Sequence, residues 1–254
     1  MIDAYVHCGL SKYEPVESVL ATMKTVGVAR AVLVQHLGEY DNGYIEKVVA
    51  LHPGNFTAVA LIDPESLDWE ERLSALVDSP ALSGLRLTAD MMMSNPALGL
   101  AAASMGLVPV LYTPDGVTPV RDAISELAAS VPEGPLVITH LGCPRVDGDH
   151  MVDGWDLLEL SELPNVLVTL SGLSMFCPFP HRPLSRFVRE VIDAFTTDRI
   201  LWGSNFPVGG DASDYARDLA LVRSGHWGLA PPHIERITEG NAAGVFFPAV
   251  DRKE

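Results

Sequence analysis

The chain has 254 residues, 48 % of them hydrophobic, which is enough for one large core, so we expect residues 1–254 to form a single domain. Its formal net charge of −16 disfavours nucleic acid and anionic membrane surfaces as partners. Three cysteines are too few for a disulfide framework at this length. With no apolar run near the ~18 residues of a membrane helix and no leader-like start, we expect a cytoplasmic protein.

Short apolar segments alternate with longer amphipathic segments, the pattern typical of repeated βα units. Eight strands are predicted, at residues 2–6, 31–35, 56–61, 84–87, 108–112, 136–139, 166–170 and 200–203. Helices are predicted at 16–26, 43–51, 69–77, 96–105, 117–129, 155–160, 184–195 and 215–223, with a last one at 232–247. The methionines at 91–93 are predicted to form an apolar loop. Eight such units without a linker favour an α/β fold, a single (β/α)8 TIM-type barrel with a C-terminal closing helix.

Polar side chains stand at the predicted ends of most strands. In (β/α)8 barrels the chemistry lies at the C-terminal ends of the strands. The residues selected on this ground are Tyr5, His7, Arg86, Tyr112, His140, Arg145, Ser171 and Asn205. We therefore expect these side chains to converge on one face of the barrel.

Six motifs occur in a characteristic order along nearly the whole chain. They are Ile-Asp-Ala-Tyr-Val-His at 2–7, Gly-Leu-Arg at 84–86, Ile-Thr-His-Leu-Gly-Cys-Pro at 138–144, Thr-Leu-Ser-Gly-Leu at 169–173, Trp-Gly-Ser-Asn-Phe-Pro at 202–207 and Gly-Asn-Ala-Ala at 240–243. Together they resemble the amidohydrolase-related family, and more narrowly its sugar-lactone and pyrone-dicarboxylate lactonase branch. The resemblance implies a (β/α)8 barrel, in agreement with the strand count.

The resemblance also shows where this chain departs from the family pattern. The family's first strand usually ends in His-x-His, and here Tyr5 takes the first place while His7 keeps the second. Asn205 stands where the last strand usually carries a metal-binding or water-activating aspartate. Two imidazoles with a phenol and a carboxamide are a poor ligand set for a catalytic zinc, which needs three good ligands. We therefore expect no metal cofactor, with a single divalent metal such as zinc as the minority alternative.

Residue roles follow from what lactone hydrolysis requires: an activated water, donors for the oxyanion and a handle for the substrate. His140, with an ordinary pKa of about 6.5, is the expected general acid and base. His7 and Asn205 are expected to polarise the carbonyl, with Tyr5 as a further catalytic donor. Arg86 is expected to hold a substrate carboxylate by its guanidinium fork. Tyr112, Ser171 and Arg145 are further expected substrate contacts.

The leading hypothesis is a hydrolase that acts on a lactone or related cyclic carbonyl compound bearing a carboxylate, hence a small anionic substrate. The altered residues leave two alternatives open. One is a metal-free lyase, isomerase or cyclase in a biosynthetic pathway, and the other is a catalytically inactive ligand-binding barrel. A homodimer is a family-level expectation.

Overall fold

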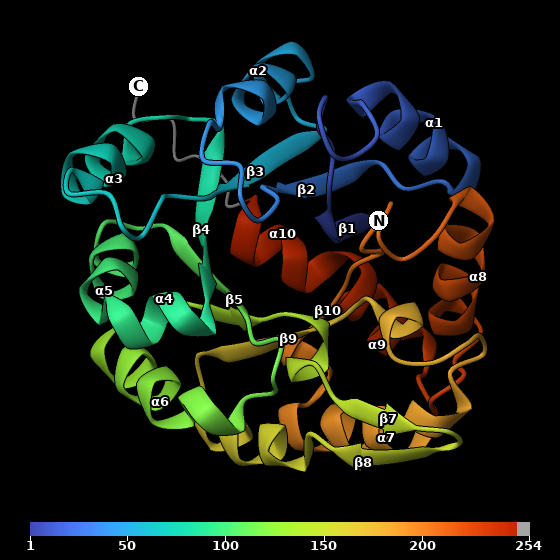
Figure 1. Cartoon of the computed structure of the whole chain (residues 1–254). Coiled ribbons are helices and arrows are strands. Elements are labelled where there is room, and N and C mark those ends of the chain that lie inside the picture. Colours follow the sequence, from blue (N-terminus) through green and yellow to red (C-terminus); the bar gives the residue numbers. More distant parts are fainter. Residues whose placement is uncertain (248–254) are drawn as a thin grey trace.

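The structure, a computed structural model, describes residues 1–247. Eight parallel strands form one sheet in the order β1-β2-β3-β4-β5-β6-β9-β10, and Figure 1 shows the sheet curled into a ring surrounded by helices. The strands are β1 Ile2–Val6, β2 Arg30–Val34, β3 Phe56–Ala60, β4 Leu82–Thr88, β5 Val108–Tyr112, β6 Leu136–Ile138, β9 Val166–Leu170 and β10 Ile200–Trp202. Strands that follow one another along the chain lie side by side in the sheet, and right-handed crossover connections between them give a parallel barrel. The predicted fold class is therefore confirmed.

The helices cover the outside of the ring and bury one face each against the strands. They are α1 Val16–Val26, α2 Gly43–Leu51, α3 Trp69–Val77, α4 Ala89–Ser94, α5 Pro96–Ser104, α6 Arg121–Ser130, α7 Ser185–Phe195 and α8 Ala212–Arg223. The predicted helix at 155–160 is a 3₁₀ segment, Trp155–Glu162. No helix within residues 1–247 is both long and apolar enough to cross a membrane.

Two further elements differ from the prediction. The methionines at 91–93 do not form a loop but lie in the short helix α4. Thr88, the residue before this helix, caps it, because its side chain accepts the Met91 N–H. An antiparallel hairpin of β7 Arg145–Asp147 and β8 His150–Asp153 follows β6, where no strand was predicted. Its strands are only three and four residues long, and the charged residues Arg145, Asp147 and Asp153 interrupt their apolar ones, so they lack the hydrophobic alternation by which strands are recognised.

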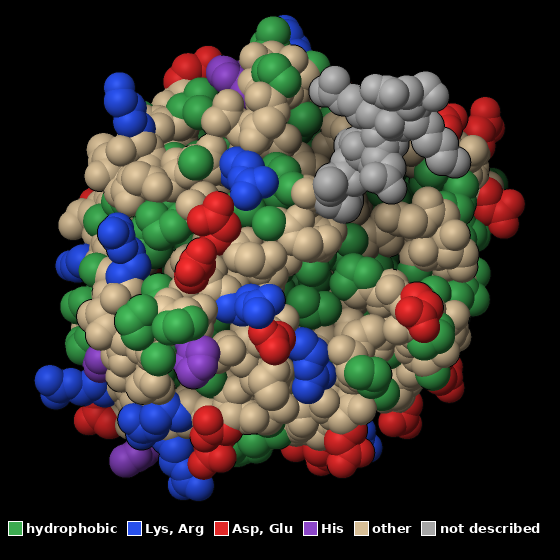
Figure 2. Space-filling model, turned by 180° about the vertical axis from the view of Figure 1, so that it is seen from behind, with side chains coloured by type: hydrophobic (Ala, Val, Ile, Leu, Met, Phe, Trp, Pro, Cys, Tyr) green, Lys and Arg blue, Asp and Glu red, His purple; other side chains and the backbone are tan. Residues whose placement is uncertain are grey.

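The end of the ring opposite the strand C-termini is closed by the last helical segment. This segment runs through α9 Pro231–Glu235, a π-helical turn Arg236–Gly240 and α10 Asn241–Phe246. Ala242 and Phe246 pack inside the ring against strand-start residues such as Ile2 and Leu201. The face seen from behind carries acidic and basic side chains interspersed (Figure 2). The opposite end of the barrel is thus left as the open end.

Backbone hydrogen bonds beyond the strand β10 complete the ring at its open end. The Asn205 N–H donates to the Tyr5 carbonyl at 2.9 Å, and the His7 N–H donates to the Phe206 carbonyl at 2.8 Å. The buried Asp3 carboxylate accepts the Ser204 N–H at 2.9 Å and the Ser204 hydroxyl at 2.5 Å. These bonds fix His7 and Asn205 next to each other across the seam of the barrel.

Candidate active site

A cavity of about 190 Å³ opens at the C-terminal ends of the strands. It collects five of the eight predicted residues, and its lining consists of His7, Lys12, Tyr13, Leu37, Arg86, Tyr112, His140, Met175, Asn205 and Val208. Side chains alternate between the two faces of a strand, so residues two apart point the same way. Tyr5, two residues before His7, accordingly lies buried beneath the cavity against both imidazoles, with ring centroids 5.1 Å from His7 and 4.6 Å from His140.

The orientation of His7 is set by a bond to the neighbouring strand. Its Nδ1 lies 2.6 Å from the Val34 carbonyl oxygen, which can only accept, so Nδ1 carries the proton. In the neutral ring Nε2 is then an acceptor, and it cannot donate to a substrate carbonyl as the sequence-based role required. The ring also stacks on Tyr13 at 4.9 Å between centroids. His7 is therefore suited to accept a hydrogen bond from a water.

His140 is held by a chain of hydroxyl groups from strand β9. Its Nδ1 lies 2.9 Å from the Ser171 hydroxyl, which lies 2.7 Å from the Thr169 hydroxyl. The Thr169 hydroxyl in turn accepts the His140 N–H at 2.9 Å. Ser171, predicted as a substrate contact, thus orients His140 instead of lining the cavity.

The backbone around His140 is held in an unusual conformation. His140, Leu141, Gly142 and Cys143 are consecutive residues with φ between 54° and 67°. Such a conformation costs of order 1–3 kcal/mol at a non-glycine residue and persists only where the surroundings enforce it. The neighbouring Gly172 has φ +65°, and a Cβ placed there would lie 2.8 Å from His140 Nδ1 and 3.0 Å from Met175 Sδ. The imidazole therefore occupies space that only a glycine at 172 leaves free.

Both imidazoles are neutral at ordinary pH. Burial, and after it the Arg86 charge, lowers the pKa of His140 to about 3. The same two causes, in the same order, hold the pKa of His7 well below its usual value. The pKa of His140 in the folded protein thus lies well below the unperturbed histidine value of about 6.5.

Two buried donors beside these imidazoles have no hydrogen-bond partner within residues 1–247. They are the Tyr5 hydroxyl and Nε of Arg86. The Arg86 guanidinium is anchored by Nη1, which donates to the Gln35 carbonyl at 2.7 Å, and it lies 5.3 Å above the Tyr112 ring. Burial raises the pKa of Tyr5 to about 12, so its hydroxyl stays protonated and able to donate. Buried donors are rarely left unpaired, so each of these two groups retains an unused hydrogen bond close to the imidazoles.

Asn205 takes a left-handed conformation, with φ 56°, that asparagine adopts more readily than most residues. Its side-chain Nδ2 lies 3.1 Å from Met175 Sδ, so the amide faces the cavity next to a weak acceptor that a ligand can displace. Its backbone meanwhile closes the barrel. The side chain thus lies where the predicted contact with a ligand requires it, while the backbone forms the turn after β10.

Arg145 is the predicted residue that the structure places elsewhere. It lies on β7, is 72 % exposed, and forms an ion pair at 3.6 Å with Asp153 across the hairpin. The cavity instead contains Lys12 and Tyr13, which were not selected. Both follow β1 within seven residues of His7, so their position in a loop at the active end was the available signal.

Comparison with known proteins identifies the family. The family model described as amidohydrolase matches residues 7–247. The chain belongs to the amidohydrolase family. An L-fucono-1,5-lactonase from Burkholderia ambifaria is 31 % identical over 242 residues, which cover 89 % of this chain and 82 % of that protein.

Solved structures show that this amidohydrolase shares its fold with many barrels. A zinc-bound amidohydrolase from Burkholderia multivorans superposes with a TM-score of 0.79 at 17 % identity, covering 97 % of this chain and 98 % of that one. A candidate 2-pyrone-4,6-dicarboxylic acid hydrolase from Pseudomonas putida gives a TM-score of 0.78 at 19 % identity, with 98 % of both chains covered. At these identities the likeness establishes the fold alone.

The zinc in the first of these structures raises the question whether this amidohydrolase has residues that fit a metal. Among residues 1–247, no three His, Cys, Asp or Glu side chains gather closely enough to hold an ion. Tyr5 and Asn205 supply a phenol of raised pKa and a carboxamide, and the Arg86 cation lies close enough to the two imidazoles to lower the pKa of each. A cation beside the site opposes the binding of a second one. The residues present do not fit a catalytic zinc.

Proposed function

We propose that this amidohydrolase hydrolyses the cyclic ester of a small hydroxy acid, a lactone, with protein groups alone. The observation that carries the proposal is the arrangement of two neutral imidazoles beside two unpartnered buried donors, the Tyr5 hydroxyl and Arg86 Nε. Ester hydrolysis needs acceptors for the protons of a water and donors for the carbonyl oxygen. The lactonase relative supports the choice of a lactone among esters.

Each group has a role in the proposed reaction. The lactone carbonyl oxygen lies near the Tyr5 hydroxyl and Arg86 Nε, whose hydrogen bonds strengthen as the oxygen becomes negative. A water donates one hydrogen bond to His7 Nε2, which aligns it, and gives its other proton to His140 as its oxygen bonds to the carbonyl carbon. The ring carbon–oxygen bond then breaks, and the leaving oxygen takes the proton back from His140. The product is the open-chain hydroxy acid.

The low pKa of His140 suits this cycle. In the free protein Arg86 opposes protonation of the ring. The tetrahedral intermediate is negatively charged and forms beside Arg86, so it offsets the positive charge of the guanidinium. The pKa of the His140 imidazole therefore rises as the reaction proceeds, and the ring becomes a stronger base. The imidazolium is thus stabilised in the transition state more than in the resting enzyme, which is the condition for catalysis.

The lining charges favour an anionic substrate. Lys12 and Arg86 are the two ionised side chains among the residues that line the cavity, although the whole chain carries a net charge of −16. Arg86 uses Nη1 for the Gln35 carbonyl and retains its other nitrogens for a ligand. A lactone bearing a carboxylate fits this local excess of positive charge.

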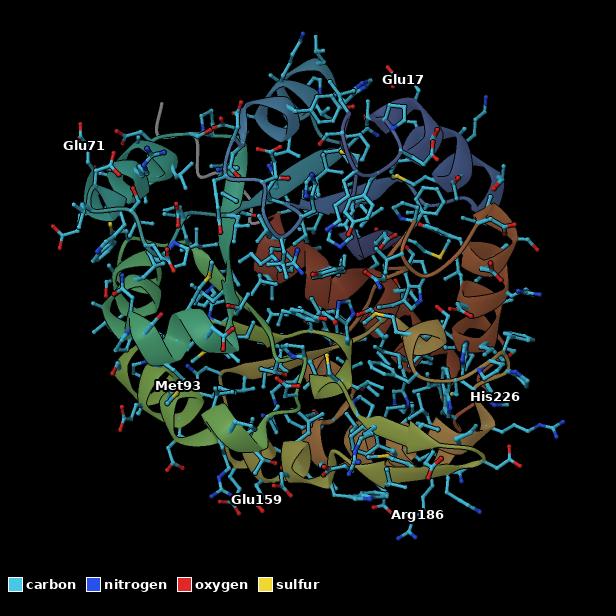
Figure 3. The ribbon with its side chains drawn as sticks, viewed as in Figure 1. Glu17, Glu71, Met93, Glu159, Arg186 and His226 are labelled. Atoms are coloured by element: carbon cyan, nitrogen blue, oxygen red, sulfur yellow. The ribbon has the colours of Figure 1, made fainter. Side chains whose placement is uncertain are left out.

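The test is a pH-indicator assay on chelator-treated protein with a panel of five- and six-membered aldonolactones and their carboxylated analogues. We expect at least one lactone to open faster than its spontaneous rate, and His140→Asn to lose about 10²- to 10⁴-fold of that acceleration. His226→Asn is the matched control, because Figure 3 shows His226 extending outward at the periphery, away from the ring. Equal rates in the wild type and His140→Asn would contradict the assignment.

The alternatives have separate signatures. A lyase, isomerase or cyclase could use the same neutral imidazoles and the Tyr5 hydroxyl to move a proton between carbon and oxygen, and it would give a product that contains no oxygen from water. A binding barrel without activity would retain an acid unchanged after long incubation.

A further inference from the structure

A second, larger hollow adjoins the active-site cavity. It has a volume of about 430 Å³ and is lined by residues from the ends of β5, β6 and β9 and from the β7–β8 hairpin, which Figure 1 shows at the edge of the ring. Its lining is Pro114, Asp115, Gly116, Thr118, Cys143, Pro144, Arg145, Val146, Asp153, Gly154, Met175 and Phe176. We call this hollow the hairpin chamber.

Met175 forms a common wall of the two spaces, because it lines both the cavity and the hairpin chamber. The chain also connects them directly, since His140 lies in the cavity while Cys143 and Arg145 line the chamber. The wall is adaptable: a methionine side chain has three rotatable bonds, and the contact of its sulfur with the Asn205 amide is weak. A ligand in the cavity can therefore extend past Met175 into the chamber.

The sizes support one continuous ligand. Pockets for small molecules usually measure roughly 300–1,000 Å³. The cavity alone, at about 190 Å³, is below that range, whereas the cavity and the chamber together fall within it. A lactone ring that contacts only the cavity residues, such as His7 and His140, would leave the hairpin chamber empty.

The chemistry of the chamber indicates what the extension is. The Asp115 and Asp153 carboxylates can accept hydrogen bonds from the hydroxyl groups of a ligand. The Arg145 guanidinium can donate hydrogen bonds to the oxygens of those hydroxyl groups. Pro144 and Phe176 add apolar surface on which the face of a sugar ring can pack. Opposite charges and apolar surface in one hollow fit a neutral polyhydroxylated group better than a second anion or an alkyl chain.

We propose that the hairpin chamber binds a second sugar ring attached to the lactone, so that the enzyme prefers the lactone of an oligosaccharide acid to that of a single sugar. The proposal rests on the lactonase function proposed above and names its substrate class. It also gives the β7–β8 hairpin, the insertion that departs from the simple βα alternation, a role as the outer wall of the subsite.

The test compares D-glucono-1,5-lactone with cellobiono-1,5-lactone, which differ only by the added sugar. We expect kcat/KM at least tenfold higher for the larger lactone, and a ratio near one in Asp115→Ala and Arg145→Ala. Asp147→Ala is the matched control, because this exposed acid lies on the same hairpin outside the chamber lining and should leave the ratio unchanged. Equal kcat/KM for both lactones in the wild type, or a loss in the variants that is the same for both, would overturn the proposal.

Calorimetry with gluconate and cellobionate separates failure of the subsite from failure of the proposed function. If neither lactone is hydrolysed but cellobionate binds at least tenfold more tightly in an Asp115-dependent way, the lactonase function is wrong and the subsite stands. If neither acid binds, or both bind equally in the wild type and in Asp115→Ala, the subsite is wrong as well.

Discussion

Tyr5→Phe should separate activity from stability. The Tyr5 hydroxyl is buried and has no partner within residues 1–247, so its removal breaks no protein hydrogen bond. An unpaired buried hydroxyl costs about 1–3 kcal/mol, and its loss should leave the free energy of unfolding unchanged or raise it within that range. Loss of one donor to a developing oxyanion lowers kcat by about 10²- to 10³-fold. We therefore expect a variant that is at least as stable as the wild type and far less active.

The assay combines lactone hydrolysis with urea denaturation. Tyr44→Phe is the matched control, because the Tyr44 hydroxyl accepts the Val16 N–H at 3.0 Å away from the cavity. That variant should lose about 1 kcal/mol of stability and keep its activity. The reasoning is refuted if Tyr5→Phe keeps full activity, or if its activity falls in proportion to a loss of folded protein.

Three further outcomes are expected. Because burial and Arg86 lower the pKa of His140 to about 3, kcat/KM should stay level as the pH falls from 7 to about 5, whereas a fall centred near the ordinary histidine value of about 6.5 would contradict this pKa. Gly172→Ala should reduce activity at least tenfold, roughly 1.4 kcal/mol, by displacing His140, whereas Gly27→Ala, at a similar φ of +74° with no atom within 4 Å of the added Cβ, should cost stability alone. Burial raises the pKa of Asp3 from 3.8 to about 6, so the folded state holds the proton more tightly and the free energy of unfolding should fall as the pH rises through that window. Asp3→Asn removes this dependence, so denaturation at several pH values should show wild-type stability falling by about 3 kcal/mol relative to the variant, and parallel profiles would speak against the shift.

The barrel could be predicted from the sequence because its strands are short apolar runs and its helices are amphipathic. The strands at Ile2–Val6, Val108–Tyr112 and Val166–Leu170 have the predicted bounds, and the other five differ by one or two residues at one or both ends. The β7–β8 hairpin could not be recognised, because its strands are held by pairing with each other and not by a hydrophobic pattern. Eight side chains were selected because they stand at predicted strand ends, and five of them line one cavity in the structure.

The chemistry of those side chains depended on contacts between distant segments. The tautomer of His7 is set by the Val34 carbonyl, 27 residues away, and no local motif encodes that bond. The pKa of His140 depends on its burial and on Arg86, which reaches the cavity from another strand. The hydroxyl of Ser171 supports His140 because of the register between β6 and β9. Sequence motifs therefore located the site, whereas the three-dimensional structure was needed to assign donors and acceptors within it.

Hydrolysis in ¹⁸O-labelled water tests the central claim most directly. Chelator-treated wild type would be incubated with the lactone selected by the panel assay, and the product analysed by mass spectrometry beside the same reaction with His140→Asn. The account predicts one labelled oxygen in the product carboxylate, formed rapidly by the wild type and at close to the spontaneous rate by the variant. An unlabelled product, or a wild-type rate that disappears with the chelator and returns with zinc, would contradict it.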